Sequence, residues 1–319
     1  VTGVQTCALP ILIGLDIGRG FLKGYTDVNG NKKQCLFKSI IGEGRNIDVK
    51  DYDDPISIEY DGANWFVGLL AEKESQTPIR NSKDSKISNT VQVLMAAAFN
   101  ELAIEDEVNI MLGVPYKAFR KSVLEEIVET YKGKIIKVKD KLNGGYKNVK
   151  INDIAIGRES DAALYWQVRN NDRNDKPVGL VSVGFRTTEF SYFDKGLKFN
   201  DKKSDTMEFG NRSVMSNVKD KLMEKDIIKD LNEIDTSDDY EDLKEKAYKI
   251  ATENIEQNIE DKWINLDEMD IYIAGGTSLN MKFDKQFKVV DDPQMATAKG
   301  LWLMGNLQFK PKEVTNEEN

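Results

Sequence analysis

The sequence predicts an α/β protein that consists of two similar domains. Predicted strands and helices alternate along most of the chain, and a length of 319 residues corresponds to about two domains. Two stretches half a chain apart, residues 11–25 and 180–193, also share one pattern. In each of them an apolar run breaks at a short glycine-bearing turn and then resumes, which is typical of strand, tight turn and strand.

The first half begins with three antiparallel strands. Leu12–Asp27 is predicted to form a strand–turn–strand, Asn29-Gly30-Asn31 a hairpin turn, and Lys33–Ile41 a third strand. A polar stretch and a second small hairpin follow. We therefore expect a minor lobe, residues about 43–86, to be inserted into this domain.

Helices and strands alternate in the rest of the first half. Ile87–Asn100 and Phe119–Tyr131 have the apolar spacing of helices, and Ser88 suits the N-cap of the first one. The other elements predicted here are strands at 108–114, 134–142, 146–151 and 154–156 and a helix from Asp161 to Val168.

The second half repeats the alternation after its own strand–turn–strand. Helices are predicted from Asn211 to Lys225 and through an acidic stretch to Trp263. Met269–Ala274 is an apolar strand that ends in Gly275-Gly276, and a last helix follows from Gln294 to about Met304. We expect domain I at residues 11–175, domain II at 176–304, and a C-terminal tail, 305–319, that returns towards domain I.

Residues 1–10 are not typical of a protein N-terminus. They contain no initiator Met and resemble the translation of a common sequencing-library adapter. A secretory signal would have a basic start and a longer apolar core. We therefore expect a non-native segment here, with a short native tail as the alternative.

The composition excludes several kinds of surface and chemistry. With 45 basic and 54 acidic residues, a nucleic-acid surface spread over the whole protein is not expected. No histidine is present, so any catalysis must use carboxylates, lysines, arginines, hydroxyls or the backbone. No run approaches the roughly 20 apolar residues of a membrane span, so no membrane partner is expected. The two cysteines, Cys7 and Cys35, offer no disulfide framework and indicate a reducing, cytoplasmic compartment.

The two glycine-bearing turns are the candidate binding elements. Backbone N–H groups in such a turn can surround a phosphate, because glycines leave room for close approach. An acid at the end of a buried strand, as at Asp16 before Gly18 and Gly20, often faces a cation. The alternatives are that Asp16 only closes the turn and that Lys23 is an edge lysine reaching solvent.

Taken in order, the motifs resemble the actin-like ATPase superfamily, whose actin-like (ribonuclease H-like) fold has two α/β domains flanking a nucleotide cleft. Within it the chain is most similar to bacterial plasmid-segregation actins of the ParM type, over residues 11 to about 308. The matching motifs are Asp16-x-Gly18-x-Gly20-x-x-Lys23, Arg158-Glu159-Ser160-Asp161, Gly184-x-x-Thr187-Thr188, Gly210-Asn211-Arg212-Ser213, Ile273-Ala274-Gly275-Gly276 and Asp292-Pro293-Gln294. These motifs in this order are much more specific than any single glycine pair.

The resemblance implies a role for each motif. Asp16 would hold Mg²⁺ through waters, Lys23 would neutralise phosphate oxygens, and Glu159 would orient the attacking water as the catalytic residue. The implied nucleotide is ATP, with GTP as the alternative. The other residues implied in binding it are Gly18, Arg19, Gly20, Gly184, Phe185, Arg186, Thr187, Asn211, Gly275 and Gly276.

Several of these residues have structural alternatives. Glu159 could cap the following helix or pair with Arg158, and Asn211 could be purely structural. Asp161 fits a first-turn acid favoured by the helix dipole, so it is not a catalytic candidate. The chain also departs from the superfamily at Ser182, where many members carry a metal-anchoring Asp, and this departure leaves metal geometry and hydrolysis rate open.

The resemblance implies a polymerising ATPase whose dynamic, head-to-tail filaments segregate plasmid DNA through a DNA-bound adaptor of the ParR type. Contact with DNA would then be indirect, which suits the net charge of −9. The alternatives are a small-molecule (sugar-type) kinase of the same superfamily and a nucleotide-binding regulator with weak hydrolysis. A kinase needs a further acid to accept a proton from a substrate hydroxyl, and the sequence offers no clear candidate.

Overall fold

The computed structural model describes residues 10–83, 85–170 and 175–310. They fold into two compact units: residues up to 162 together with those from 298 onwards form unit 1, and residues 163–297 form unit 2. The chain passes between the units within α4 (Glu159–Val168) and near the start of α8 (Ala296–Gln308).

This division differs from the predicted boundaries at 175/176 and 304/305, because α4 and α8 each supply side chains to two different cores. Residues 305–308, predicted as tail, are the last turn of α8. The predicted non-native segment lies outside the described residues except for Pro10, and the tail lies outside them from residue 311.

Unit 1 is built on a ten-stranded sheet with the order β3-β2-β1-β8-β10-β9-β5-β6-β4-β7. β1 pairs in parallel with β8, and β8 with β10, whereas β1–β2 and β2–β3 are antiparallel. The strands predicted at 146–151 and 154–156 are one strand, interrupted only by a register shift. The bounds are β1 Ile11–Ile17, β2 Phe21–Val28, β3 Asn31–Lys38, β4 Ile40–Glu43, β5 Ile56–Tyr60, β6 Ala63–Val67, β7 Ile79–Arg80, β8 Glu107–Val114, β9 Ile135–Asp140 and β10 Tyr146–Arg158.

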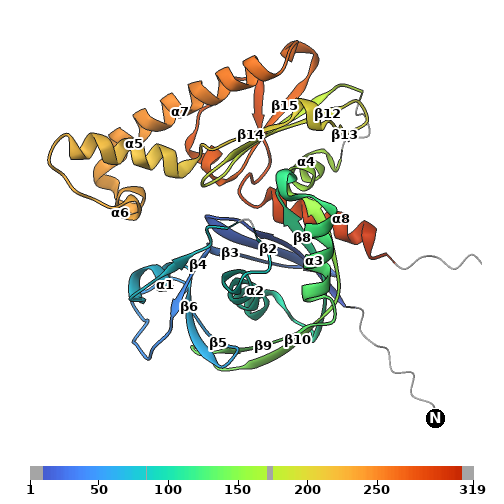
Figure 1. Cartoon of the computed structure of the whole chain (residues 1–319), viewed down its shortest axis with the longest axis vertical. Helices are drawn as coiled ribbons and strands as arrows, with labels where there is room; N and C mark the ends of the chain where they lie inside the picture. The colour runs from blue at the N-terminus through green and yellow to red at the C-terminus, as the bar shows by residue number, and fades with distance from the viewer. Residues whose placement is uncertain (1–9, 84, 171–174, 311–319) are drawn as a thin grey trace, which may run out of the picture. The chain divides into compact units, whose positions relative to one another are not determined.

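Helix α2 (Asn89–Leu102) lies inside the curl of this sheet (Figure 1). Residues 93–99 are all fully buried, so this helix is apolar on every side rather than on one stripe. Each large side chain buried in this way contributes about 1.5–3 kcal/mol relative to an exposed one. The predicted N-cap is confirmed, because the Ser88 hydroxyl accepts a hydrogen bond from the Val91 N–H.

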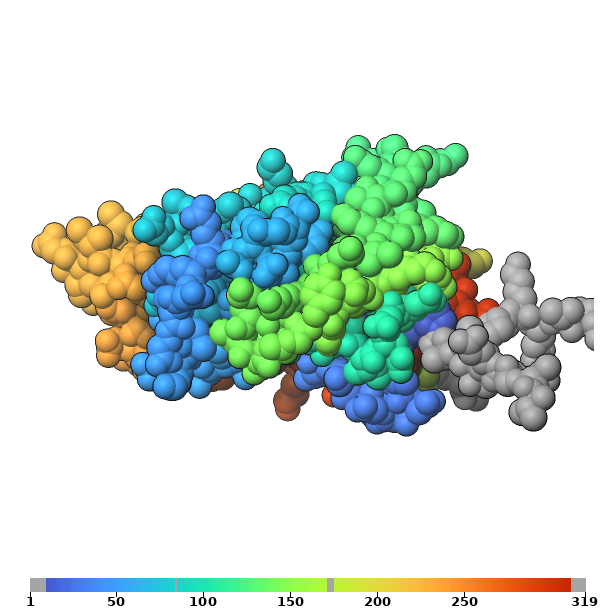
Figure 2. Space-filling view, turned by 90° about the horizontal axis from the view of Figure 1, so that it is seen from below, coloured from blue at the N-terminus to red at the C-terminus, as the bar shows by residue number. Residues whose placement is uncertain are grey.

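The residues predicted as a minor lobe extend the sheet of unit 1. β5 pairs with β9, and β4 pairs with both β6 and β7. In Figure 2 the blue surface of β5 and β6 accordingly borders the green surface of β9 and β10. Helix α1 (Leu69–Glu74) adds a small core of its own, in which Leu70 packs with Ile40 and Phe66. The remaining elements of unit 1 are η1 (Tyr116–Ala118) and α3 (Lys121–Tyr131).

Unit 2 is built on a six-stranded sheet in which β11 (Val178–Val183) lies between β12 (Thr188–Asp194) and β15 (Asp270–Ala274). Trp263 fills the core on the side of the long helices, and Gly179 leaves the room that its ring requires. Among the described residues no helix combines the length and the apolar character needed to cross a membrane. The remaining elements are β13 Lys198–Phe199, η2 Asp201–Lys203, β14 Asp205–Met207, α5 Asn211–Met223, α6 Leu231–Thr236, η3 Asp238–Tyr240, α7 Glu241–Lys262, η4 Leu266–Glu268, η5 Gly276–Asn280 and β16 Phe287–Val289.

Candidate functional site

The first predicted turn connects β1 to β2 and is closed by its own backbone. The Gly18 N–H donates to the Phe21 carbonyl at 3.1 Å, so this donor is used within the turn. Two neighbours hold the turn from outside: the Asn81 amide donates to the Gly18 carbonyl at 3.1 Å, and the Ser39 N–H donates to the Gly20 carbonyl at 2.8 Å. Arg19 lies between the two glycines, half-buried. Backbone and side-chain hydrogen bonds within unit 1 therefore hold the turn on their own.

Asp16 and Lys23 lie directly opposite each other on β1 and β2. The Lys23 Nζ is 2.6 Å from the Asp16 Oδ2, and Asp16 is only 4% exposed. The second oxygen of Asp16, Oδ1, is buried and has no hydrogen-bond partner among the described residues. A buried carboxylate oxygen without a partner is costly, so this atom is suited to a cation or to water bound to a cation.

Glu159 is the first residue of α4 and directly follows β10. Its Oε1 is 3.1 Å from the Nζ of Lys86. Gly113 on β8 leaves room for it, since a Cβ there would lie 3.0 Å from the Glu159 Cγ. Burial raises the pKa of Glu159, the charge of Lys86 opposes that rise, and the negative charge of Asp16 adds to it. The structure thus brings Glu159 into the electrostatic environment of Asp16 and Lys23, all within unit 1.

Asp161 has a local structural role. Two nitrogens of Arg158 donate to its Oδ2, at 2.7 and 2.9 Å, and the Arg158 guanidinium lies over the Phe119 ring. Burial raises the pKa of Asp161, and this ion pair opposes the rise. Arg158 therefore pairs with Asp161 in unit 1, whereas the sequence had left a pairing with Glu159 open.

The second predicted turn has the same backbone closure as the first. The Gly184 N–H donates to the Thr187 carbonyl at 2.9 Å. The carbonyls of this turn bind the start of α5. The N–H groups of Asn211 and Arg212 donate to the carbonyl oxygens of Gly184 and Phe185, respectively. These helix N-terminal donors are therefore satisfied within unit 2. Thr188 points into the core and donates to the Phe209 carbonyl, which leaves Thr187 as the partly exposed member of the pair.

Aligning the two turns on Gly18 and Gly184 shows where the halves differ. The opposed pair Asp16 and Lys23 of unit 1 corresponds to Ser182 and Glu189 of unit 2, which are also directly opposite each other. Glu189 is buried, at 8% exposed. The carboxylate that Ser182 lacks is thus present one strand away on the same face of the sheet.

Because Glu189 lies opposite Ser182, introducing at position 182 the Asp that many superfamily members carry should change the stability of unit 2. Ser182→Asp places two carboxylates opposite each other, and such pairs are destabilising. We expect the melting temperature in EDTA to fall by roughly 2–4 °C, which corresponds to about 1 kcal/mol, and Mg²⁺ to recover part of the loss. Thermal melts by circular dichroism measure this. Ser182→Asn is the uncharged control, and identical melts for the two variants in EDTA would contradict the juxtaposition.

The side chain of Asn211 is used inside unit 2. Its amide donates to Asp235 at 3.2 Å, and its oxygen accepts from the Tyr248 hydroxyl at 2.6 Å. These two bonds use one N–H and one oxygen lone pair of the amide, so the structural alternative has direct support, and only the remaining N–H and lone pair could contact a nucleoside. Burial raises the pKa of Tyr248 to about 12, which keeps this donor protonated.

Gly275 and Gly276 lie at the carboxyl end of β15. Gly275 has φ +92°, and a Cβ there would be 2.3 Å from the Val183 carbonyl oxygen. A side chain at Gly276 would contact Gln294 at 3.3 Å. Close packing within unit 2 is therefore sufficient reason for glycine at 275, with or without a ligand.

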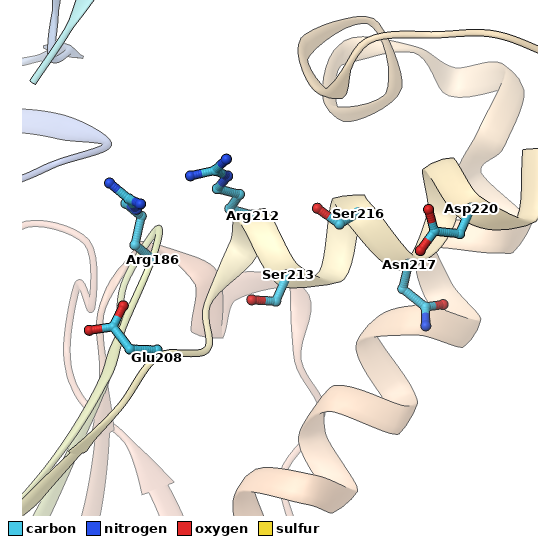
Figure 3. A pocket seen from close by; sticks show the side chains of 7 residues that line it. All are labelled: Arg186, Glu208, Arg212, Ser213, Ser216, Asn217 and Asp220. Carbon is cyan, nitrogen blue, oxygen red and sulfur yellow. The ribbon is translucent and has the colours of Figure 1, made fainter. Parts of the chain in front are cut away.

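An open pocket of about 430 Å³ lies beside the start of α5. Figure 3 shows the guanidinium groups of Arg186 and Arg212 on the same side of this helix, with Glu208 below Arg186. Of the residues that line it, Arg186 was a predicted binding residue, and Arg212 and Ser213 belong to the motif that resembles a nucleoside border. The lining residues are Arg186, Glu208, Arg212, Ser213, Ser216, Asn217 and Asp220.

The described side chains fit a magnesium ion only if they bind it through its water ligands. Among the described residues there is no group of three or more acidic or cysteine side chains that could enclose a metal ion. Mg²⁺ keeps most of its waters and commonly uses one or two carboxylates together with substrate phosphates. The partnerless Oδ1 of Asp16 suits that mode.

Comparison with known proteins assigns the fold. Residues 14–160 match the family model for the actin-like proteins N-terminal domain. A non-polymerisable quadruple mutant of pCBH ParM is 22% identical, with 94% of this chain and 100% of that chain covered and a TM-score of 0.75. A 15-stranded ParM filament from Clostridium botulinum is 20% identical, with 94% and 100% covered and a TM-score of 0.77. The archaeal actin homologue Ta0583 in complex with ADP is 17% identical, with 93% and 99% covered and a TM-score of 0.73.

A comparison with curated proteins finds no match. The chain therefore has an actin-like fold with two α/β lobes, as the sequence predicted. Solved ParM structures share this fold, so the predicted resemblance to the ParM type is confirmed at the level of the fold.

Two residues at the first turn escaped sequence reasoning. Lys86 and Asn81 lie in the polar run Asn81-Ser82-Lys83-Asp84-Ser85-Lys86, which resembles a solvated loop. Both are buried, at 5% and 3% exposed, because they bind carbonyls of the β1 end and the turn. No periodicity or motif distinguishes Lys86 from Lys83, so only the tertiary structure reveals its role.

Proposed function

We propose that this protein is a nucleotide-dependent polymerising ATPase that forms dynamic filaments and segregates plasmid DNA through a DNA-bound adaptor of the ParR type. The observation that carries the proposal is the cluster at the first turn, where Asp16, Lys23 and Glu159 gather around a glycine turn. Neighbours of the same fold support it: one was solved with ADP, and two were solved as filaments.

The cluster contains the groups that phosphoryl transfer to water requires. That reaction depends mostly on positioning and electrostatics, so a histidine base is not necessary. Lys23 provides a cation 2.6 Å from Asp16 that can also approach phosphate oxygens. Glu159 would accept a hydrogen bond from the attacking water and orient it. A bound Mg²⁺ would neutralise phosphate charge, with Asp16 holding its water shell.

The proposed partners follow from charge and assembly. A head-to-tail filament uses two different faces of each subunit, so the protein would be its own main partner. The net charge of −9 favours indirect contact with DNA, through a basic adaptor. We place the assembly in the cytoplasm, with ATP or GTP as the nucleotide.

The test is light scattering and pelleting of the protein with Mg-ATP, Mg-GTP or a non-hydrolysable analogue, without any acceptor sugar. Nucleotide-dependent scattering that decays as phosphate is released is the expected result. Persistent scattering without phosphate release would support a nucleotide-binding regulator. Nucleotide binding without scattering at any concentration would contradict the filament proposal and lead to a screen of small-molecule acceptors for a kinase.

Asp16→Asn tests the metal assignment in the same protein. The substitution keeps the size of the side chain and removes the charge that would hold hydrated Mg²⁺, so nucleotide should bind more weakly and without dependence on the metal. We expect a loss of about tenfold, or 1.4 kcal/mol, in the presence of Mg²⁺ and little change in EDTA. Calorimetric titration with ADP measures both. An affinity that still depends on Mg²⁺ as in the wild type would remove Asp16 from the metal site.

A further inference from the structure

Lys86 is a buried lysine next to the candidate catalytic residue. It is 5% exposed, and its Nζ donates to the Ile17 carbonyl at 2.8 Å and to the Glu159 Oε1 at 3.1 Å. A charged amine in the interior is costly unless it is paired and hydrogen-bonded. These two contacts meet that requirement, and they join the end of β1 to the beginning of α4.

The backbone of Lys86 is fixed as well. Its carbonyl accepts a hydrogen bond of 2.6 Å from the hydroxyl of Tyr131, which is fully buried on α3. Helix α2 begins three residues later, with its N-cap at Ser88. The lysine is thus held at its base and at its tip, which limits the positions open to the ammonium group.

The position of Glu159 depends on few other groups. Gly113 provides space beside its Cγ, and within the described residues Lys86 is the side chain that donates a hydrogen bond to the carboxylate. The second contact of Lys86, to Ile17, ties the carboxylate to the residue that follows Asp16. One ammonium group therefore sets the distance between the candidate catalytic carboxylate and the strand that carries the candidate metal ligand.

We propose that Lys86 is a positioning residue for nucleotide hydrolysis. It keeps the Glu159 carboxylate ionised and fixes the orientation of that carboxylate relative to β1. The inference rests on the proposed function, because it assumes that Glu159 orients the attacking water. Lys86 itself need not touch nucleotide. A displacement of about 1 Å at a reacting group can cost about 100-fold in rate, so a residue of this kind is expected to affect kcat strongly.

The test compares Lys86→Met, which keeps a chain of similar length without charge, with the wild type and with Lys134→Met. Lys134 is another partly buried lysine of unit 1, which binds Gln92 rather than Glu159. We expect Lys86→Met to lower kcat for phosphate release about 10- to 100-fold with KM changed much less. Lys134→Met should leave both constants near the wild-type values.

The double variant with Glu159→Gln separates positioning from a general structural effect. If Lys86 acts through Glu159, adding Lys86→Met to the Glu159→Gln protein should lower its hydrolysis rate little or not at all. The effects of substitutions at two coupled residues are not additive. Equal slowing in both backgrounds would overturn the proposal. If circular dichroism shows that Lys86→Met does not fold, Lys86→Gln replaces it in the same set of single and double variants. Glutamine keeps a donor for the Ile17 carbonyl.

A readout without nucleotide keeps this test distinct from a test of the ATPase itself. Carboxyl ¹³C resonances of glutamate in the nucleotide-free protein report the ionisation of Glu159. Since the charge of Lys86 opposes the rise in the pKa of Glu159, removing it should raise that pKa further. An unchanged titration would overturn the inference. A wild type that hydrolyses no nucleotide would overturn the proposed function as well, whereas hydrolysis unaffected by Lys86→Met would overturn this inference alone.

Discussion

Glu159→Gln should slow hydrolysis of nucleotide by about 10²–10⁴-fold, the range typical of a lost acid–base group, while nucleotide affinity stays close to that of the wild type. Glutamine has the same shape and can still accept a hydrogen bond from Lys86, but it cannot hold the attacking water as a carboxylate does. Because filaments are expected to disassemble after hydrolysis, scattering induced by nucleotide should rise normally and then persist. Phosphate release and scattering, followed in one cuvette, measure both effects.

Asp161→Asn is the matched control for this prediction. It removes a carboxylate two residues further along α4, which pairs with Arg158 and is no part of the cluster at the first turn. Its hydrolysis rate should stay within a few-fold of the wild type. Wild-type turnover in Glu159→Gln would exclude Glu159 as the catalytic residue, and an equal loss in Asp161→Asn would indicate a general defect of α4.

Gly300→Ala should destabilise unit 1 by about 3 kcal/mol or more, at the upper end of the usual cost of overpacking. Gly300 lies on α8, and a Cβ there would be 1.8 Å from the carbonyl oxygen of Ala162 and 2.4 Å from its carbonyl carbon. Both atoms belong to the backbone of α4, so no side-chain rotation relieves the clash and the two helices must separate. Urea unfolding, followed by circular dichroism, measures the shift of the midpoint.

Gly305→Ala is the control on the same helix. A Cβ there would lie 2.7 Å from the Leu12 Cδ1, and that leucine side chain can move. The gain in helix propensity of alanine over glycine, about 1 kcal/mol, should offset most of the remaining strain. Similar midpoints for the two variants would show that α4 and α8 tolerate separation at Gly300.

The sequence was sufficient for those parts of the site that depend on local geometry. Asp16 and Lys23 were both candidates from one predicted hairpin, and the β1–β2 register places them opposite each other. Glu159 became a candidate through its motif, and the first turn and the second turn through their glycines. The identical closure of both turns confirms the pattern that the two halves share.

Other features depended on residues that are distant in the sequence. The role of Asn211 is set by Asp235 and Tyr248, which come from two later elements. The boundaries of the two units differ from the predicted ones because α4 and α8 each pack into two cores, and helix periodicity does not reveal how many neighbours a helix has. The carboxylate opposite Ser182 likewise becomes visible only with the β11–β12 register.

The sequence by itself determined the fold class and the two glycine turns, because apolar periodicity and turn chemistry act over a few neighbouring residues. Only the tertiary structure decided that Lys86 is buried against Glu159 and the end of β1. A lysine in a polar run is favoured in water by its own hydration. It becomes an interior residue only when distant segments supply the acceptors that replace that water.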